Sequence, residues 1–80
     1  METRVAVMSI IVENTNSIET LNATLHEYRN YIIGRMGLPY HQKNINIISI
    51  ALDAPQDVIS ALSGRIGNLE GVSVTIAFSK

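Results

Sequence analysis

Two histidines are the side chains of this 80-residue chain best suited to metal or acid–base chemistry. His26 is followed by Glu27 late in an expected helix, and His41 follows Tyr40 in an expected hairpin turn. The imidazole nitrogens of the two histidines and the oxygens of Glu27 and Tyr40 are possible metal ligands. A subunit interface could bring these groups together around one metal ion, with His26 as the leading ligand. A histidine near a helix C-terminus is also stabilised by the helix dipole without any function. A polar turn residue such as His41 likewise needs no special role.

Arg35 is the candidate for holding an anion. It lies between Gly34 and Gly37, and small residues allow a ligand or another backbone to come close. The alternative is that these glycines permit a β-bulge or close sheet packing. The ligand-binding candidates are therefore His26, Arg35, Tyr40 and His41.

The composition excludes several classes of protein. Six Lys and Arg residues against seven Asp and Glu residues give a net charge of −1, so we expect no direct binding of nucleic acid by this chain alone. The absence of cysteine excludes disulfides, thiolate metal sites and a cysteine nucleophile. No apolar run approaches the roughly 20 residues of a membrane span. No signal peptide is recognisable, so the expectation is a soluble cytoplasmic protein without membrane contact.

Hydrophobic periodicity predicts the order β-α-β-β-α-β. Strands are expected over residues 4–13, 31–38, 45–52 and 72–79, the first with both of its faces covered. A first helix is expected over 16–29, capped by Asn16 with Glu19. A second helix is expected to begin at Asp53–Pro55 and to end at Gly67 in a left-handed conformation.

This order predicts an α+β ferredoxin-like sandwich. A single domain over residues 1–80 would place both helices on one face of a four-stranded antiparallel sheet. The other face would carry small and apolar side chains rather than charges, and such a face usually has a partner. The candidates for an oligomer interface on this face are Ser49, Ala51, Ser73 and Thr75.

Several segments of the chain resemble the family of small regulators of the iron-only hydrogenase system. The most specific is IIGRMGLPY at residues 32–40, preceded by LHEY at 25–28. Similar segments follow at residues 47–50, 59–64 and 69–74, so the resemblance covers nearly the whole chain. It implies an ACT-like version of the ferredoxin fold and a role in regulating that system, transcription included.

A more distant similarity is to the C-terminal regulatory domain of nickel-responsive repressors. That family binds nickel between subunits through three histidines and a cysteine. His26 falls at one of these ligand positions, whereas Gly37, Pro39 and Ile45 fall at the other three and have no metal-binding side chains. The repressors' DNA-binding arm has no counterpart in this sequence. The similarity therefore implies a regulatory fold without the nickel site.

We expect a non-enzymatic regulatory module that forms a homodimer or homotetramer through the uncovered sheet face or by edge pairing. A small ligand or metal would bind at the subunit interface, and the sequence identifies no cofactor. One alternative is a ligand-free adaptor that binds a protein of the hydrogenase maturation or regulation system. Another is an enzyme that uses His26 and His41.

Overall fold

In the computed structural model, which describes residues 2–80, strand β1 (Arg4–Val12) alternates between core and water. Ala6, Met8, Ile10 and Val12 are at most 1% exposed, whereas Val7 between them is 42% exposed. Only one face of this strand is covered, which corrects the prediction that both are. Residue 1 of the domain predicted over 1–80 lies outside the described residues.

The four strands pair in the order β2-β3-β1-β4, and every neighbouring pair is antiparallel. The other three strands are β2 (Ile32–Tyr40), β3 (Ile45–Ala54) and β4 (Val72–Phe78). Met8 of β1 lies opposite Ile50 of β3 on one side and Ile76 of β4 on the other. The predicted α+β ferredoxin-like fold with βαββαβ order is confirmed.

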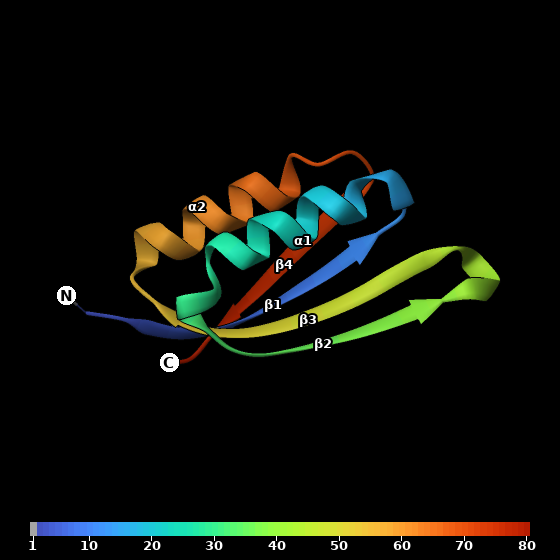
Figure 1. The fold of residues 1–80 in the computed structure, drawn as a ribbon. Helices are drawn as coiled ribbons and strands as arrows, with labels where there is room; N and C mark the ends of the chain where they lie inside the picture. Colours follow the sequence, from blue (N-terminus) through green and yellow to red (C-terminus); the bar gives the residue numbers. More distant parts are fainter. Residues whose placement is uncertain (1) are drawn as a thin grey trace.

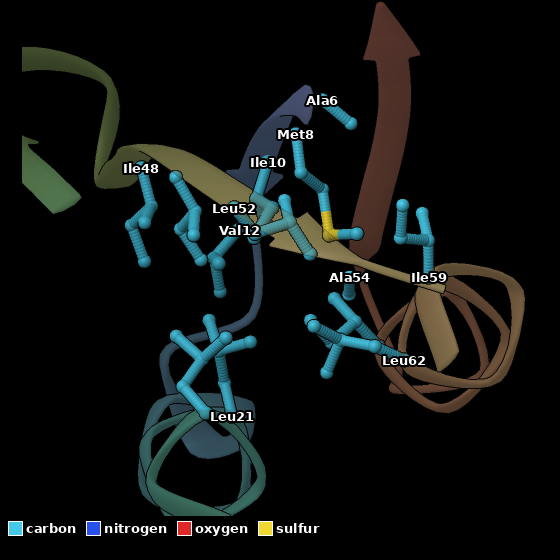
Figure 2. Close-up of a cluster of buried hydrophobic side chains, with 13 residues drawn as sticks. Ala6, Met8, Ile10, Val12, Leu21, Ile48, Leu52, Ala54, Ile59 and Leu62 are labelled. Atoms are coloured by element: carbon cyan, nitrogen blue, oxygen red, sulfur yellow. The ribbon is translucent and has the colours of Figure 1, made fainter. Parts of the chain in front are cut away.

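Helices α1 (Ile18–Glu27) and α2 (Gln56–Gly67) lie side by side on the same face of the sheet (Figure 1). Their apolar residues recur every three or four positions, so they form one stripe on each helix. Figure 2 shows these side chains meeting the sheet residues in one buried cluster. The fully buried helix members are Leu21, Leu25, Ile59, Leu62 and Ile66. Burying each such side chain stabilises the fold by roughly 1.5–3 kcal/mol.

The start of α1 differs from the prediction of a cap at Asn16. A short 3-10 turn, η1 (Thr15–Ser17), precedes the helix, and Asn14 Oδ1 accepts a hydrogen bond from the Asn16 amide at 2.9 Å. Ser17 adjoins α1 but does not cap it, because its hydroxyl donates to the Glu70 carbonyl oxygen at 2.7 Å. A tertiary hydrogen bond therefore replaces the local cap.

The end of α2 also differs from the prediction. Gly67 is the last helical residue, and Asn68 after it keeps a right-handed conformation with φ −81°. The left-handed glycine is instead Gly71, with φ 70°, where the chain turns into β4. The start of α2 shifts as well, since β3 continues through Ala54 and the helix begins after Pro55.

Strands β2 and β3 form a hairpin whose far half extends beyond the helix layer (Figure 1). We call residues 36–47 the hairpin arm. At its tip, the 3-10 turn η3 (His41–Lys43) is followed by Asn44 in the left-handed conformation, with φ 55°. At the start of β2, the pairing register shifts between Ile32 and Gly34, which agrees with the predicted bulge at a glycine. None of the helices in residues 2–80 is long and apolar enough to cross a membrane.

Candidate functional site

A pocket of about 270 Å³ opens between α1, the 3-10 turn η2 (Arg29–Tyr31) and the first half of β2. The turn η2 reverses the chain, so residues of the helix and of the following strand face the same space. Six residues line it: Asn22, Leu25, His26, Arg29, Ile32 and Arg35. The pocket thus joins the end of the first helix to the edge strand of the sheet.

Hydrogen bonds to neutral oxygens hold both guanidinium groups at the rim of this pocket. Arg29 Nη1 donates to the backbone carbonyl of His26 at 2.9 Å. Arg35 Nη2 donates to Asn22 Oδ1 at 3.0 Å and so ties β2 to α1. Below these groups, Leu25 is 1% exposed and Ile32 is half-buried, which gives the pocket an apolar floor.

The pocket lining carries positive charge and no carboxylate. Glu27, next to His26 in sequence, pairs with Arg65 of α2 at 2.6 Å, and this is the one salt bridge within residues 2–80. Contact with Tyr28 and with Glu27 raises the pKa of Arg65 above its ordinary value. Glu19 lies one helical turn before Asn22 and outside the lining. The two pocket arginines therefore have no acidic partner among the described residues.

The structure divides the four predicted ligand-binding residues between two places. His26 and Arg35 line the pocket together, whereas Tyr40 and His41 lie at the tip of the hairpin arm. Along β2, Tyr40 lies five residues beyond Arg35, a separation of roughly 17 Å. At the tip, the Tyr40 hydroxyl and Gln42 Oε1 are 2.8 Å apart, in hydrogen-bonding contact. Within one copy, Tyr40 and His41 cannot share a ligand with His26.

The described residues contain no group of three or more His, Cys, Asp or Glu side chains placed to hold a metal ion. His26 has Glu27 as its sequence neighbour, but the carboxylate of Glu27 is engaged by Arg65. The metal role of His26 stays a prediction about an assembly of several copies.

The sequence analysis missed two polar residues of the pocket, Asn22 and Arg29, although their spacing gives a signal for them. Asn22, His26 and Arg29 are spaced by four and three positions, which places them on one face of a helix. Arg29 lies just beyond α1 in η2, and its guanidinium reaches back to the last turn of the helix. Its proximity to Arg35 follows from the reversal at η2, which no local pattern indicates.

The uncovered side of the sheet is the second feature with functional potential. Its side chains belong to alternate strand residues that share one side by register. We call this surface the open face; it comprises Val5, Val7, Ser9, Ile11, Met36, Leu38, Tyr40, Ile45, Ile47, Ser49, Ala51, Asp53, Ser73, Thr75 and Ala77. All four residues predicted for an oligomer interface lie on it. Asp53 is its only charged member.

Comparison with known proteins adds a family and a fold. The family model "TM1266-like: Iron-only hydrogenase system regulator, putative" matches residues 4–76. The solved structure of TM1266 from Thermotoga maritima is similar, with a TM-score of 0.95 and 32% sequence identity over 99% of this chain and 100% of that one. The search of curated proteins found no significant match.

A formyltetrahydrofolate deformylase from Pseudomonas putida KT2440 shares the fold, with a TM-score of 0.66. Its identity to this chain is 14%, and the match covers 91% of this chain but 28% of the deformylase. At that identity the likeness concerns the fold alone.

Proposed function

Because this chain belongs to the TM1266-like family of iron-only hydrogenase system regulators, we propose that it is a non-enzymatic regulatory module built from several copies joined through the open face. The family supports the regulatory role. The character of the open face supports the assembly. A small ligand bound to the module would regulate it by favouring one state of assembly, to the extent that its affinity differs between the states.

The observation that carries the assembly is the near absence of charge on a water-exposed sheet face. Val7 and Ile11 of β1 are 42% and 43% exposed there, and Met36 of β2 is 69% exposed. Serine, threonine and alanine fill six of the other positions, and a row of Ser49, Ser9 and Thr75 crosses the middle of the face. A sheet face that exposes valine, isoleucine, leucine and methionine side chains and carries almost no charge usually marks an interaction site.

A second copy of this chain fits the open face by area. The chain exposes 5205 Å², whereas a compact monomer of 8.8 kDa exposes about 4,800 Å². Four strands of about seven paired residues present roughly 400 Å² of flat area, so two stacked copies bury upwards of roughly 800 Å². Protruding side chains add to this flat area, and small stable interfaces bury roughly 1,200 Å².

A second copy also fits the open face by charge. With Asp53 at one end as the only charge, two identical faces can stack with little like-charge repulsion. The same face offers no charged feature by which a different acidic or basic protein would be selected. Both points favour self-association.

The test is native mass spectrometry of untagged protein prepared anaerobically without chelator. We expect the wild type to be a dimer or tetramer. Ala51→Arg and Thr75→Arg each place a cation in the middle of the open face and should give monomers. Ala61→Arg makes the same change on an exposed position of α2 and should assemble like the wild type.

Circular dichroism spectra would show that the three variants are folded. Wild-type assembly in both open-face variants would contradict the proposal. A monomeric wild type would contradict it too and would favour the adaptor hypothesis, in which the open face binds a different protein.

The enzyme hypothesis requires His26 and His41 to act together. His26 lies at the end of α1, beside the start of β2, whereas His41 follows the far end of β2. Within one copy the two histidines therefore cannot form an acid–base pair.

A further inference from the structure

We propose that the pocket between α1 and β2 binds a small organic carboxylate, held by Arg29 and Arg35 over a floor of Leu25 and Ile32. The regulatory meaning of this site rests on the proposed function. The binding itself rests on the pocket alone.

Charge is the first argument for an anion. Both arginines line the pocket, and the described hydrogen bonds connect them only to neutral oxygens, of His26 and Asn22. The other two arginines of the chain are engaged elsewhere: Arg65 pairs with Glu27, and Arg4 lies 4.2 Å from the centre of the Phe78 ring. In a chain with net charge −1, the pocket is therefore a local concentration of unneutralised cations.

Geometry is the second argument. A guanidinium carries five N–H donors, and each of these two arginines uses one nitrogen in the contact that fixes it at the rim. The remaining donors keep the planar fork that matches the two oxygens of a carboxylate. Because Arg35 is already tied to Asn22, part of its side-chain freedom is lost before any ligand arrives.

The size and the floor of the pocket narrow the class of anion. A volume of about 270 Å³ lies below the roughly 300–1,000 Å³ of pockets that take drug-sized ligands, so a nucleotide would not be enclosed. The buried Leu25 and half-buried Ile32 offer apolar contact to a short carbon chain. Inorganic phosphate has no carbon chain to use this floor. A carboxylate with a few carbon atoms matches both features.

The first experiment is an NMR titration of the ¹⁵N-labelled full chain with four probes. These are sodium butyrate, sodium succinate, inorganic phosphate and uncharged butyramide, at constant ionic strength and pH. We expect butyrate and succinate to shift the amide signals of residues 22–35, phosphate to bind more weakly, and butyramide to leave these signals in place. Equal shifts with butyramide would overturn the role of charge, and tighter binding of phosphate would overturn the assignment to carboxylates.

The second experiment assigns the binding to the two arginines. Arg29→Gln and Arg35→Gln should each raise the Kd for the tighter-binding carboxylate at least about tenfold, since each removes hydrogen bonds to a charged group. Arg35→Lys keeps the charge but loses the fork, and its Kd should lie between those of the wild type and Arg35→Gln.

Lys43→Gln is the matched control, because it removes one positive charge at the tip of the hairpin arm. Its Kd should equal that of the wild type, and an increase like that of the arginine variants would overturn the site in favour of general charge attraction. Unchanged binding in both Arg→Gln variants would also overturn it. A wild type that assembles but binds neither carboxylate overturns this inference and leaves the proposed assembly standing.

Discussion

At the scale of single residues, the few charges of this chain differ in whether they are neutralised. Arg65 and Glu27 form an exposed pair, and such pairs contribute little to stability because water and salt screen them. Arg29 and Arg35 instead donate hydrogen bonds to neutral oxygens, so their positive charges are not neutralised at the pocket. The proposed carboxylate site rests on these two unneutralised cations.

Gly71 is a residue whose type is fixed by backbone geometry. Its φ of 70° is unfavourable for other residues, and an added Cβ would lie 2.7 Å from the Asn14 Cβ. Gly71→Ala should lower the free energy of unfolding by about 2–4 kcal/mol, measured by urea denaturation.

Gly64→Ala is the control for that change. Gly64 lies inside α2, and an added Cβ there meets no atom within 4 Å. This substitution should raise the free energy of unfolding by about 0.5–1 kcal/mol. Wild-type stability in Gly71→Ala would show that the turn into β4 relaxes to accept a side chain.

At the scale of elements, the boundaries of the helices are set by partners distant in sequence. Ser17 bonds to the Glu70 carbonyl, so the start of α1 is tied to the turn before β4. The backbone of Glu13 also donates to the Gly71 carbonyl at 2.7 Å in the same region. These contacts explain why a cap at Asn16 and a left-handed end at Gly67 were wrong, while the existence and order of the elements were right.

The two faces of the sheet predict costs of very different size for one and the same substitution. Leu21 of α1 is fully buried against the covered face, whereas Leu38 on the hairpin arm is 59% exposed. Leu21→Ala should cost about 2–5 kcal/mol of unfolding free energy, because it leaves a cavity in the core. Leu38→Ala should cost less than about 1 kcal/mol.

Both leucine variants are made in the Ala51→Arg background, so that self-association does not stabilise either one. Urea denaturation monitored by circular dichroism gives the two values. A larger cost at Leu38 than at Leu21 would mean that the hairpin arm packs against the core in solution.

At the scale of the whole molecule, the shape is elongated, with principal extents of 42 × 19 × 17 Å. The hairpin arm contributes to this length and exposes Met36, Leu38 and Ile47. The sheet thus carries one covered face and one face that water contacts. Stacking two copies would bury the second face and extend the core across the interface.

This arrangement predicts that stability depends on protein concentration. If unfolding is coupled to dissociation, the melting temperature of the wild type should rise as its concentration is increased a hundredfold. Ala51→Arg should melt at one temperature throughout that range, and Ala61→Arg should behave like the wild type. Differential scanning fluorimetry measures all three, and a concentration-independent wild type would contradict coupled assembly.

The sequence by itself determined the element order, the apolar stripes and the family, because these depend on periodicity and residue identity within short segments. The alternation of β4 and the spacing of Leu21 and Leu25 needed no tertiary information, and the family resemblance read from the segments is confirmed. It also placed His26 and Arg35 among the candidates. Only the tertiary structure decided that Arg29 joins them in one pocket and that Tyr40 and His41 lie outside it, at the tip of the hairpin arm. The physical reason is that these relations depend on the reversal at η2 and on the pairing of β2 with β3, which bring distant segments together.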